Sequence, residues 1–241
     1  MRTLDNEITP YVDETQHALD NRLMLNWYAG RILEMAEKDS LLELGLGHGI
    51  TASRFAGKFR RYVVLDGSEK VIQRFKAVYP SEVQKIEIVK TFFETFQPIE
   101  AFQNILMGFV LEHVDDPAII LDRFKPLLRA DGSLFITVPN AEALNRRYGY
   151  EAGILADMTE LSEFDRASGH KRNWGIARWQ ELIKSSGYMI EKCEGLFLKP
   201  ITTQQLLTLN LSESILQAMC KVGVDYPELC LGILMKCKRT P

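Results

Sequence analysis

The sequence is organised around ten residues, Leu41-Leu42-Glu43-Leu44-Gly45-Leu46-Gly47-His48-Gly49-Ile50. Apolar residues lead into glycines at three alternate positions, and helix-compatible sequence follows from Thr51. This order predicts a buried strand, a tight turn and the start of a helix. Glycine lets a ligand approach the backbone closely, and a helix start offers free N–H groups to an anionic ligand group. The stretch therefore predicts a ligand-binding loop.

The composition is that of an ordinary globular protein. The chain has 241 residues, of which 46% are hydrophobic and 25% are charged. A chain of this length can bury a substantial core. A formal net charge of -3 argues against broad nucleic-acid binding. The first fourteen residues carry no apolar segment of a secretory signal, and the longest apolar run, about 105–111, is too short to span a bilayer. We expect a cytoplasmic protein without nucleic-acid or membrane partners.

The cysteines gather in the last fifth of the chain without C-x-x-C spacing. This pattern favours reduced, mostly buried thiols over disulfides or a metal site. The residues are Cys193, Cys220, Cys230 and Cys237.

Strands and helices are predicted to alternate from residue 41 to residue 138. This alternation is typical of parallel βαβ units in a doubly wound, Rossmann-like α/β sheet. Such sheets bind ligands beyond the carboxyl ends of their strands, near the switch point in strand order. The expected strands are 41–44, 61–66, 86–89, 104–109 and 134–138, the expected helices are about 20–37, 50–57, 68–79 and 117–128, and a turn is expected at 130–133.

The glycine loop differs from a dinucleotide-binding fingerprint. The pattern G-x-G-x-x-G, counted from Gly45, would need glycine at position 50, where Ile50 stands. The acid Glu43 precedes the loop, where it would repel a pyrophosphate but would suit a cationic ligand. A second acid, Asp66, ends the next predicted strand at a spacing that fits a βαβ unit.

With Glu43-x-Gly45-x-Gly47-x-Gly49, the sequence resembles class I S-adenosylmethionine (SAM)-dependent methyltransferases, whose first motif is E-x-G-x-G-x-G. Asp66 resembles the acid of that family that takes both ribose hydroxyls. The segment Phe92-Phe93-Glu94 resembles the one that lines the adenine. The resemblance covers about 40–198 and implies the seven-stranded methyltransferase fold with helical lid insertions.

Two further runs narrow the resemblance to ubiquinone-biosynthesis-like and type 11–23 small-molecule methyltransferases. Phe109-Val110-Leu111-Glu112-His113-Val114 is similar to their "LEHV" run after the fourth strand. The run 127–134 resembles their L-L-(K/R)-P-G-G-x-L turn, with Ala130 in place of proline and Asp131 in place of the first glycine. These departures change the turn and leave cofactor binding undisturbed.

The resemblance implies SAM as the cofactor and S-adenosylhomocysteine as its product. The glycine loop would shape the methionine and ribose pocket, with Glu43 near the cationic amino-acid end. Tyr11, on the N-terminal arm, would close over the methionine end. The implied cofactor-binding residues are Glu43, Gly45, Leu46, Gly47, Gly49, Asp66, Gly67, Phe93, Glu94, Met107, Gly108 and Tyr11.

Two histidines are candidate general bases. A hydroxyl acceptor of the methyl group benefits from a base with a pKa near neutrality, which suits histidine. His113 follows the fourth strand, and His170 follows the insertion expected to cover the acceptor. Each also has a structural alternative, because the histidine of "LEHV" is often structural and His170 could cap a helix or face solvent. No spacing of His, Cys and carboxylates indicates a metal.

Aromatic and basic residues near the expected cleft are candidates for acceptor binding. Tyr28, Tyr148 and Trp174 could line the acceptor, with core or lid packing as the alternative. Arg172 could hold an anionic group of the substrate, with a solvated charge as the alternative.

The sequence thus predicts a SAM-dependent methyltransferase of a small molecule, with a hydroxyl oxygen favoured as acceptor. The alternatives are an N-methyltransferase of a small amine or sugar and a non-catalytic cofactor-binding or scaffold protein. A nucleic-acid or protein methyltransferase is disfavoured, since 108–111 does not match (N/D)-P-P-(Y/F). A homodimer is compatible with the sequence. We expect one domain over 1–241, with an N-terminal arm and helix at 1–38, a cofactor-binding core at 40–138, a lid insertion at 140–172 and a helical addition at 203–225.

Overall fold

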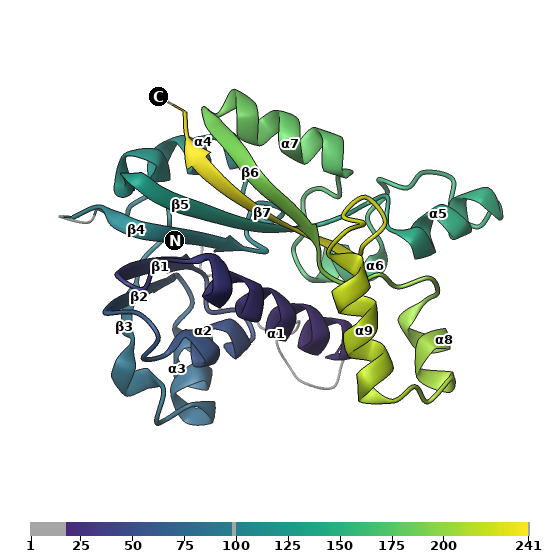
Figure 1. Ribbon diagram of the computed structural model, residues 1–241, viewed down its shortest axis with the longest axis horizontal. Helices are drawn as coiled ribbons and strands as arrows, with labels where there is room; N and C mark the ends of the chain where they lie inside the picture. The colour runs from purple at the N-terminus through teal and green to yellow at the C-terminus, as the bar shows by residue number, and fades with distance from the viewer. Residues whose placement is uncertain (1–17, 98–99, 241) are drawn as a thin grey trace.

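The computed structural model describes residues 18–97 and 100–240, so the prediction for Tyr11 lies outside the described residues. These residues form a seven-stranded sheet in the order β3-β2-β1-β4-β5-β7-β6 (Figure 1). The first five strands pair in parallel, and β7 runs antiparallel to both β5 and β6. The predicted doubly wound, mostly parallel sheet is confirmed. The strands are β1 Ser40–Leu44, β2 Arg61–Asp66, β3 Glu87–Lys90, β4 Phe102–Gly108, β5 Leu128–Pro139, β6 Tyr188–Gly195 and β7 Gly232–Arg239.

Helices cover both faces of the sheet. On one face lie α1, α2 and α3, and on the other lie α4 and α7 (Figure 1). Two hydrophobic cores result, the first between the sheet and α1, α2 and α3, and the second between the sheet and α4 and α7. Because side chains alternate along a strand, Leu41 lies in the first core, while Leu42 and Leu44 lie in the second. The helices are α1 Ala18–Met35, α2 Ile50–Phe55, α3 Glu69–Val78, α4 Pro117–Phe124, α5 Leu144–Glu151, α6 Glu163–Ala167, α7 Ile176–Ser185, α8 Thr203–Thr208 and α9 Glu213–Gly223, with short 3-10 helices at Val83–Lys85 and Lys125–Leu127.

Polar side chains cap the first turns of two of these helices. Ser68 accepts the N–H of Val71 at 3.3 Å at the start of α3. Asp116 accepts the N–H of Ala118 at 2.9 Å, and Pro117 fills the first position of α4. A proline there costs nothing, because its missing N–H would have no partner within the helix.

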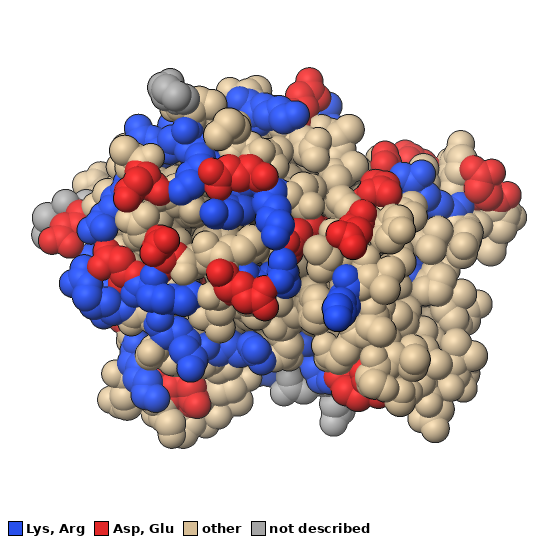
Figure 2. All heavy atoms as spheres, viewed as in Figure 1, with Lys and Arg blue, Asp and Glu red and all other residues tan. Residues whose placement is uncertain are grey.

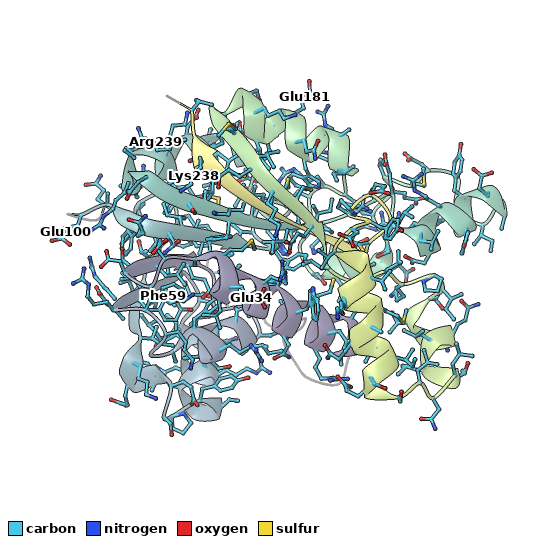
Figure 3. All side chains as sticks on the ribbon, viewed as in Figure 1. Glu34, Phe59, Glu100, Glu181, Lys238 and Arg239 are labelled. Carbon is cyan, nitrogen blue, oxygen red and sulfur yellow. The ribbon has the colours of Figure 1, made fainter. Side chains whose placement is uncertain are left out.

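The turn predicted at 130–133 is instead an irregularity inside β5. Leu128 pairs with Phe102, but the register then jumps, so that Ser133 pairs with Asn104. The extra residues bulge out of the ladder. Lys238 and Arg239, at the end of β7, donate to the carbonyls of Asp131 and Leu128 at 2.6 and 3.0 Å (Figure 3). Side chains of β7 thus hold the segment 128–133 within β5, although its own sequence predicts a turn.

The segment 203–225, predicted to be helical, contains two helices, α8 and α9, and both are tied to α1. Lys199 and Asp20 form a buried ion pair with Nζ and Oδ2 2.6 Å apart, and Thr203 donates to the same oxygen at 2.6 Å. Arg22 of α1 contacts Glu213 of α9 with both guanidinium nitrogens, at 3.1 and 3.0 Å. On the face shown in Figure 2, charged residues of both signs alternate over the sheet, whereas the surface over α8 and α9 is mostly uncharged.

The strand order places the switch point between β1 and β4. From β1 the chain moves outward through β2 and β3, and then returns to the other side of β1 for β4 and β5. The carboxyl ends of β1, β2 and β4 therefore meet at one edge, where ligands bind in such sheets. Within residues 18–97 and 100–240, the helices are all too short or too polar to cross a membrane.

Candidate active site

The glycine loop adopts the backbone that its sequence requires. Gly45, Gly47 and Gly49 have φ of 84, 50 and 77°, in the left-handed region that side chains rarely adopt. A Cβ on Gly49 would lie 2.7 Å from Cδ2 of Phe75. At Gly45, the nearest described atom to such a Cβ is 3.9 Å away, so this side of the loop is open. Such a cradle, bare of side chains, fits the close approach of a cofactor.

Asp66 joins the glycine loop to the start of α3. Its Oδ2 accepts the N–H of Leu46 at 2.9 Å, and its Oδ1 accepts the N–H of Ser68 at 2.8 Å. Gly67, between Asp66 and Ser68, completes the turn. The acid implied for the ribose hydroxyls thus lies directly against the loop, at the ends of β1 and β2.

Glu43 lies inside the protein rather than at the ligand-facing surface of the loop. Its Oε1 accepts the hydroxyl of Thr51 at 2.7 Å, and its Oε2 accepts the hydroxyl of Tyr62. Burial raises the pKa of Glu43 to about 7. Glu43 thereby ties β1 to β2 and to the first turn of α2. Its expected place near the cationic end of the cofactor stays a prediction.

Tyr28 is likewise a core residue, which corrects its prediction as an acceptor-lining residue. Only 2% of it is exposed, and its hydroxyl would lie 2.9 Å from a Cβ on Gly108. The adjacent Met107 is fully buried at the end of β4. Phe109 follows with a φ of 54°, one of two positive values among the described non-glycine residues. A left-handed conformation costs such a residue about 1–2 kcal/mol, and this kind of strain is frequent at functional sites.

The segment implied for the adenine follows β3. Phe93 is partly buried against the second core, and Glu94 is exposed. Arg123 of α4 holds the segment by donating to the carbonyls of Phe93 and Phe96 at 3.0 and 2.9 Å. Their contact with adenine stays a prediction.

The two candidate histidines lie side by side, although they are far apart in the chain. The ring centroids of His113 and His170 are 4.7 Å apart, with the rings nearly perpendicular at 84°. Glu112 joins them, and one ligand-type atom from each of the three residues lies within 4.8 Å of the others. Glu112 is fully buried, and neither of its carboxylate oxygens has a hydrogen-bond partner among the described residues. An unpaired buried carboxyl group costs stability, so its presence calls for a functional reason.

The environment separates the protonation states of these groups. Burial raises the pKa of Glu112 to about 7 and lowers that of His113 to about 4. Burial also lowers the pKa of His170, but the nearby carboxylates of Asp165 and Glu112 outweigh it, and the net shift is upward. Nδ1 of His170 lies 3.3 Å from Oδ1 of Asp165. His113 is thus held neutral, whereas His170 is the histidine suited to gain a proton.

Arg172 binds the protein's own backbone, which corrects its predicted role in holding a substrate anion. Its Nη1 donates to the carbonyls of Leu111 and Val114 at 2.5 and 2.7 Å, and its Nη2 donates to that of Asp115 at 2.8 Å. Arg172 therefore fastens the end of the segment 140–172 to the loop after β4, and this brings His170 to His113.

The two remaining acceptor candidates differ in exposure. Trp174 is partly buried, with its ring centroid 4.7 Å from that of Trp179 and the guanidinium groups of Arg172 and Arg178 over its face. Tyr148, on α5, is 55% exposed. Trp174 thus packs within the protein, and Tyr148 alone of the two offers an open aromatic face. Separately, a groove of about 510 Å³ runs between α1 and α9, lined by Arg22, Trp27, Arg54 and Glu213 among others.

Three residues of the site were not singled out from the sequence. Glu112 belongs to the "LEHV" run and Thr51 to the start of a helix, and neither position by itself predicts a role in the site. Asp165 follows Ser162 at the spacing of a helix capping box, a pattern visible in the sequence. Its contact with His170 is visible only in the folded chain.

Comparison with known proteins shows to which family this chain belongs. A family model described as "Methyltransferase domain" matches residues 16–175. A ubiquinone biosynthesis O-methyltransferase of Acinetobacter baumannii is 26% identical over 214 residues, covering 85% of this chain and 86% of that protein.

Solved structures share the fold. A methyltransferase of Thermotoga maritima, described as a possible histamine N-methyltransferase, has a TM-score of 0.65 at 15% identity and covers 98% of this chain and 99% of its own. A SAM-dependent methyltransferase of Mesorhizobium loti has a TM-score of 0.60 at 18% identity, covering 92% and 100%. The fold and the glycine loop are those of class I SAM-dependent methyltransferases. The chain belongs to this methyltransferase domain family, and it is an enzyme that uses SAM.

Proposed function

We propose that this enzyme transfers the methyl group of SAM to a hydroxyl oxygen of a small molecule, with His170 as the general base. The observation that carries the proposal is the cluster of His170, His113 and Glu112 at the edge where β4 ends. The similarity to a ubiquinone biosynthesis O-methyltransferase adds support, at 26% identity.

The glycine loop, Asp66, the segment 92–94 and the end of β4 would hold the cofactor. When bound, SAM would supply an electrophilic methyl group on its sulfonium: the acceptor oxygen would form a bond to the methyl carbon in line with the breaking C–S bond, and S-adenosylhomocysteine would leave as the neutral thioether. A neutral hydroxyl is a weak nucleophile, so the chain must remove its proton as the oxygen attacks. With Nδ1 of His170 directed at Asp165, Nε2 is the ring nitrogen left to accept that proton. The proton then passes to solvent.

The neighbouring carboxylates favour His170 over His113 as the base. A base must stabilise the proton that it receives, and the carboxylates of Asp165 and Glu112 do this for His170. His113 is partly buried, and desolvation lowers its pKa to about 4, so it holds a proton poorly at neutral pH. His113 therefore packs against the base without exchanging protons.

The proposal is tested by incubating the enzyme with SAM and a panel of phenols, alcohols and amines, and measuring S-adenosylhomocysteine release and the methylated product. We expect a methyl ether. The variant His170→Gln should lose about 10²–10⁴-fold in kcat while keeping its SAM affinity by calorimetry. The parallel variant His113→Gln should lose much less.

Three outcomes would contradict the proposal. Methylation of an amine in place of a hydroxyl would identify an N-methyltransferase. Full turnover by His170→Gln would show that His170 is not the base. The cluster of Glu112, His113 and His170 also has the composition of a site for a dication, so the assay is repeated after chelation. We expect unchanged activity. A loss of activity on chelation that added metal restores would show that a bound metal, in place of the base, activates the acceptor.

A further inference from the structure

A single carboxylate, that of Asp165, both caps α6 and contacts the proposed base. Its Oδ2 accepts the N–H and the hydroxyl of Ser162 at 2.8 and 2.7 Å, and Oγ of Ser162 accepts the N–H of Asp165 at 3.1 Å. Its other oxygen, Oδ1, is the one that lies 3.3 Å from Nδ1 of His170. The cap therefore fixes the orientation of the carboxylate and aims its second oxygen at the imidazole.

The backbone brings the His170 ring to this carboxylate by a short connection. The N–H of His170 donates to the carbonyl of Asp165 at 2.9 Å, and the N–H of Lys171 donates to the carbonyl of Glu112 at 2.8 Å. Both side chains of the pair are largely buried, with exposed fractions of 15% for His170 and 18% for Asp165. Water therefore competes little for the contact.

We propose that Asp165 is the positioning residue of the base, setting both the orientation and the tautomer of His170. This inference rests on the proposed function, in which His170 takes the proton of the acceptor. A carboxylate beside Nδ1 keeps the ring proton on that nitrogen, so the lone pair stands on Nε2. The contact meets the distance for an ion pair but falls outside hydrogen-bond geometry. Catalytic contacts of this kind commonly tighten when substrate binds.

The double role of Asp165 makes Asp165→Asn an informative change. The N–H of Ser162 needs an acceptor, so the amide oxygen of Asn must face Ser162 and the amide NH2 must face His170. Nδ1 would then have to accept a hydrogen bond, and the ring proton would move to Nε2. That tautomer cannot take a proton from the acceptor hydroxyl. The matched control is Ser162→Ala, which removes the two contacts of the hydroxyl but keeps the backbone N–H of residue 162 on Oδ2, so Oδ1 of Asp165 still faces His170.

The test is nitrogen-15 NMR of the histidine rings in the full-length enzyme, with no acceptor present, followed by a pH profile of kcat/KM. For the wild type and Ser162→Ala we expect neutral His170 to carry its proton on Nδ1. For Asp165→Asn we expect the proton on Nε2, a lower His170 pKa, a fall in kcat of about 10²–10⁴-fold and an acid limb of the profile moved to lower pH.

The outcomes separate this inference from the proposed function. An unchanged tautomer and an unchanged pKa in Asp165→Asn, with the same small loss of activity as Ser162→Ala, would reduce Asp165 to a helix cap and leave His170 as the base. Full turnover by His170→Gln would overturn the proposed function, and the positioning role with it.

Discussion

The substitution Gly49→Ala tests the reasoning about the glycine loop quantitatively. Gly49 has a φ of +77°, and a left-handed backbone costs an alanine about 1–2 kcal/mol. The added Cβ would also lie 2.7 Å from Cδ2 of Phe75 and 3.0 Å from Cε2 of Tyr79. Overpacking of this kind costs about 1–3 kcal/mol. We therefore expect the free energy of unfolding to fall by about 2–5 kcal/mol in total, a large part of the about 5–15 kcal/mol typical of a domain.

Two other glycines separate the backbone term from the collision. Gly153 has a φ of +71° with no described atom within 4 Å of its Cβ position, so Gly153→Ala should cost only the backbone term, about 1–2 kcal/mol. Gly30, inside α1, also has free space and no positive φ, so Gly30→Ala should stabilise by about 0.5–1 kcal/mol. Urea unfolding followed by circular dichroism, without cofactor, measures all three. A cost for Gly49→Ala no greater than that for Gly153→Ala would refute the predicted collision.

Two further predictions concern the acids of the site. Asp66→Ala should weaken SAM binding about 10- to 100-fold, the value of a hydrogen bond to a charged group, and calorimetry with unchanged affinity would remove Asp66 from the cofactor site. The pKa of Glu112 is about 7 in the folded chain against 4.5 in the reference state, so the folded state keeps a proton that the unfolded state releases. The wild type should therefore lose about 3 kcal/mol of stability relative to Glu112→Gln as pH rises from about 4.5 to 7, with no further loss above that range. A difference between the two proteins that does not vary with pH would contradict this.

Apart from the turn at 130–133, predictions based on local backbone chemistry agreed with the structure. The glycines at 45, 47 and 49 stand where φ is positive, and no other residue meets that requirement without strain. The second strand was predicted at 61–66 and found at Arg61–Asp66. Its run of apolar residues and the glycine and serine after it determine both ends within a few positions. The order of such elements was then enough to predict the sheet and the edge where the site lies.

Side-chain roles that depend on distant partners were predicted less well. Glu43 was expected near the cationic end of the cofactor, but its hydrogen bonds to Thr51 and Tyr62 could not be predicted from the sequence. Arg172 was expected to bind an anion or solvent, but carbonyls of the loop after β4 surround it. In each case a charged residue type indicates that a partner is needed without indicating which one.

The sequence by itself determined the strand–loop–helix unit at 41–50, because turn backbone, strand burial and helix initiation depend on neighbouring residues. The tertiary structure decided which polar groups share a site. His113 and His170 are separated by the whole of β5 and most of the segment 140–172, and they meet because Arg172 and the N–H of Lys171 bind carbonyls of the loop after β4. Local propensities carry no information about such a contact, because it is formed by packing between segments distant in the chain.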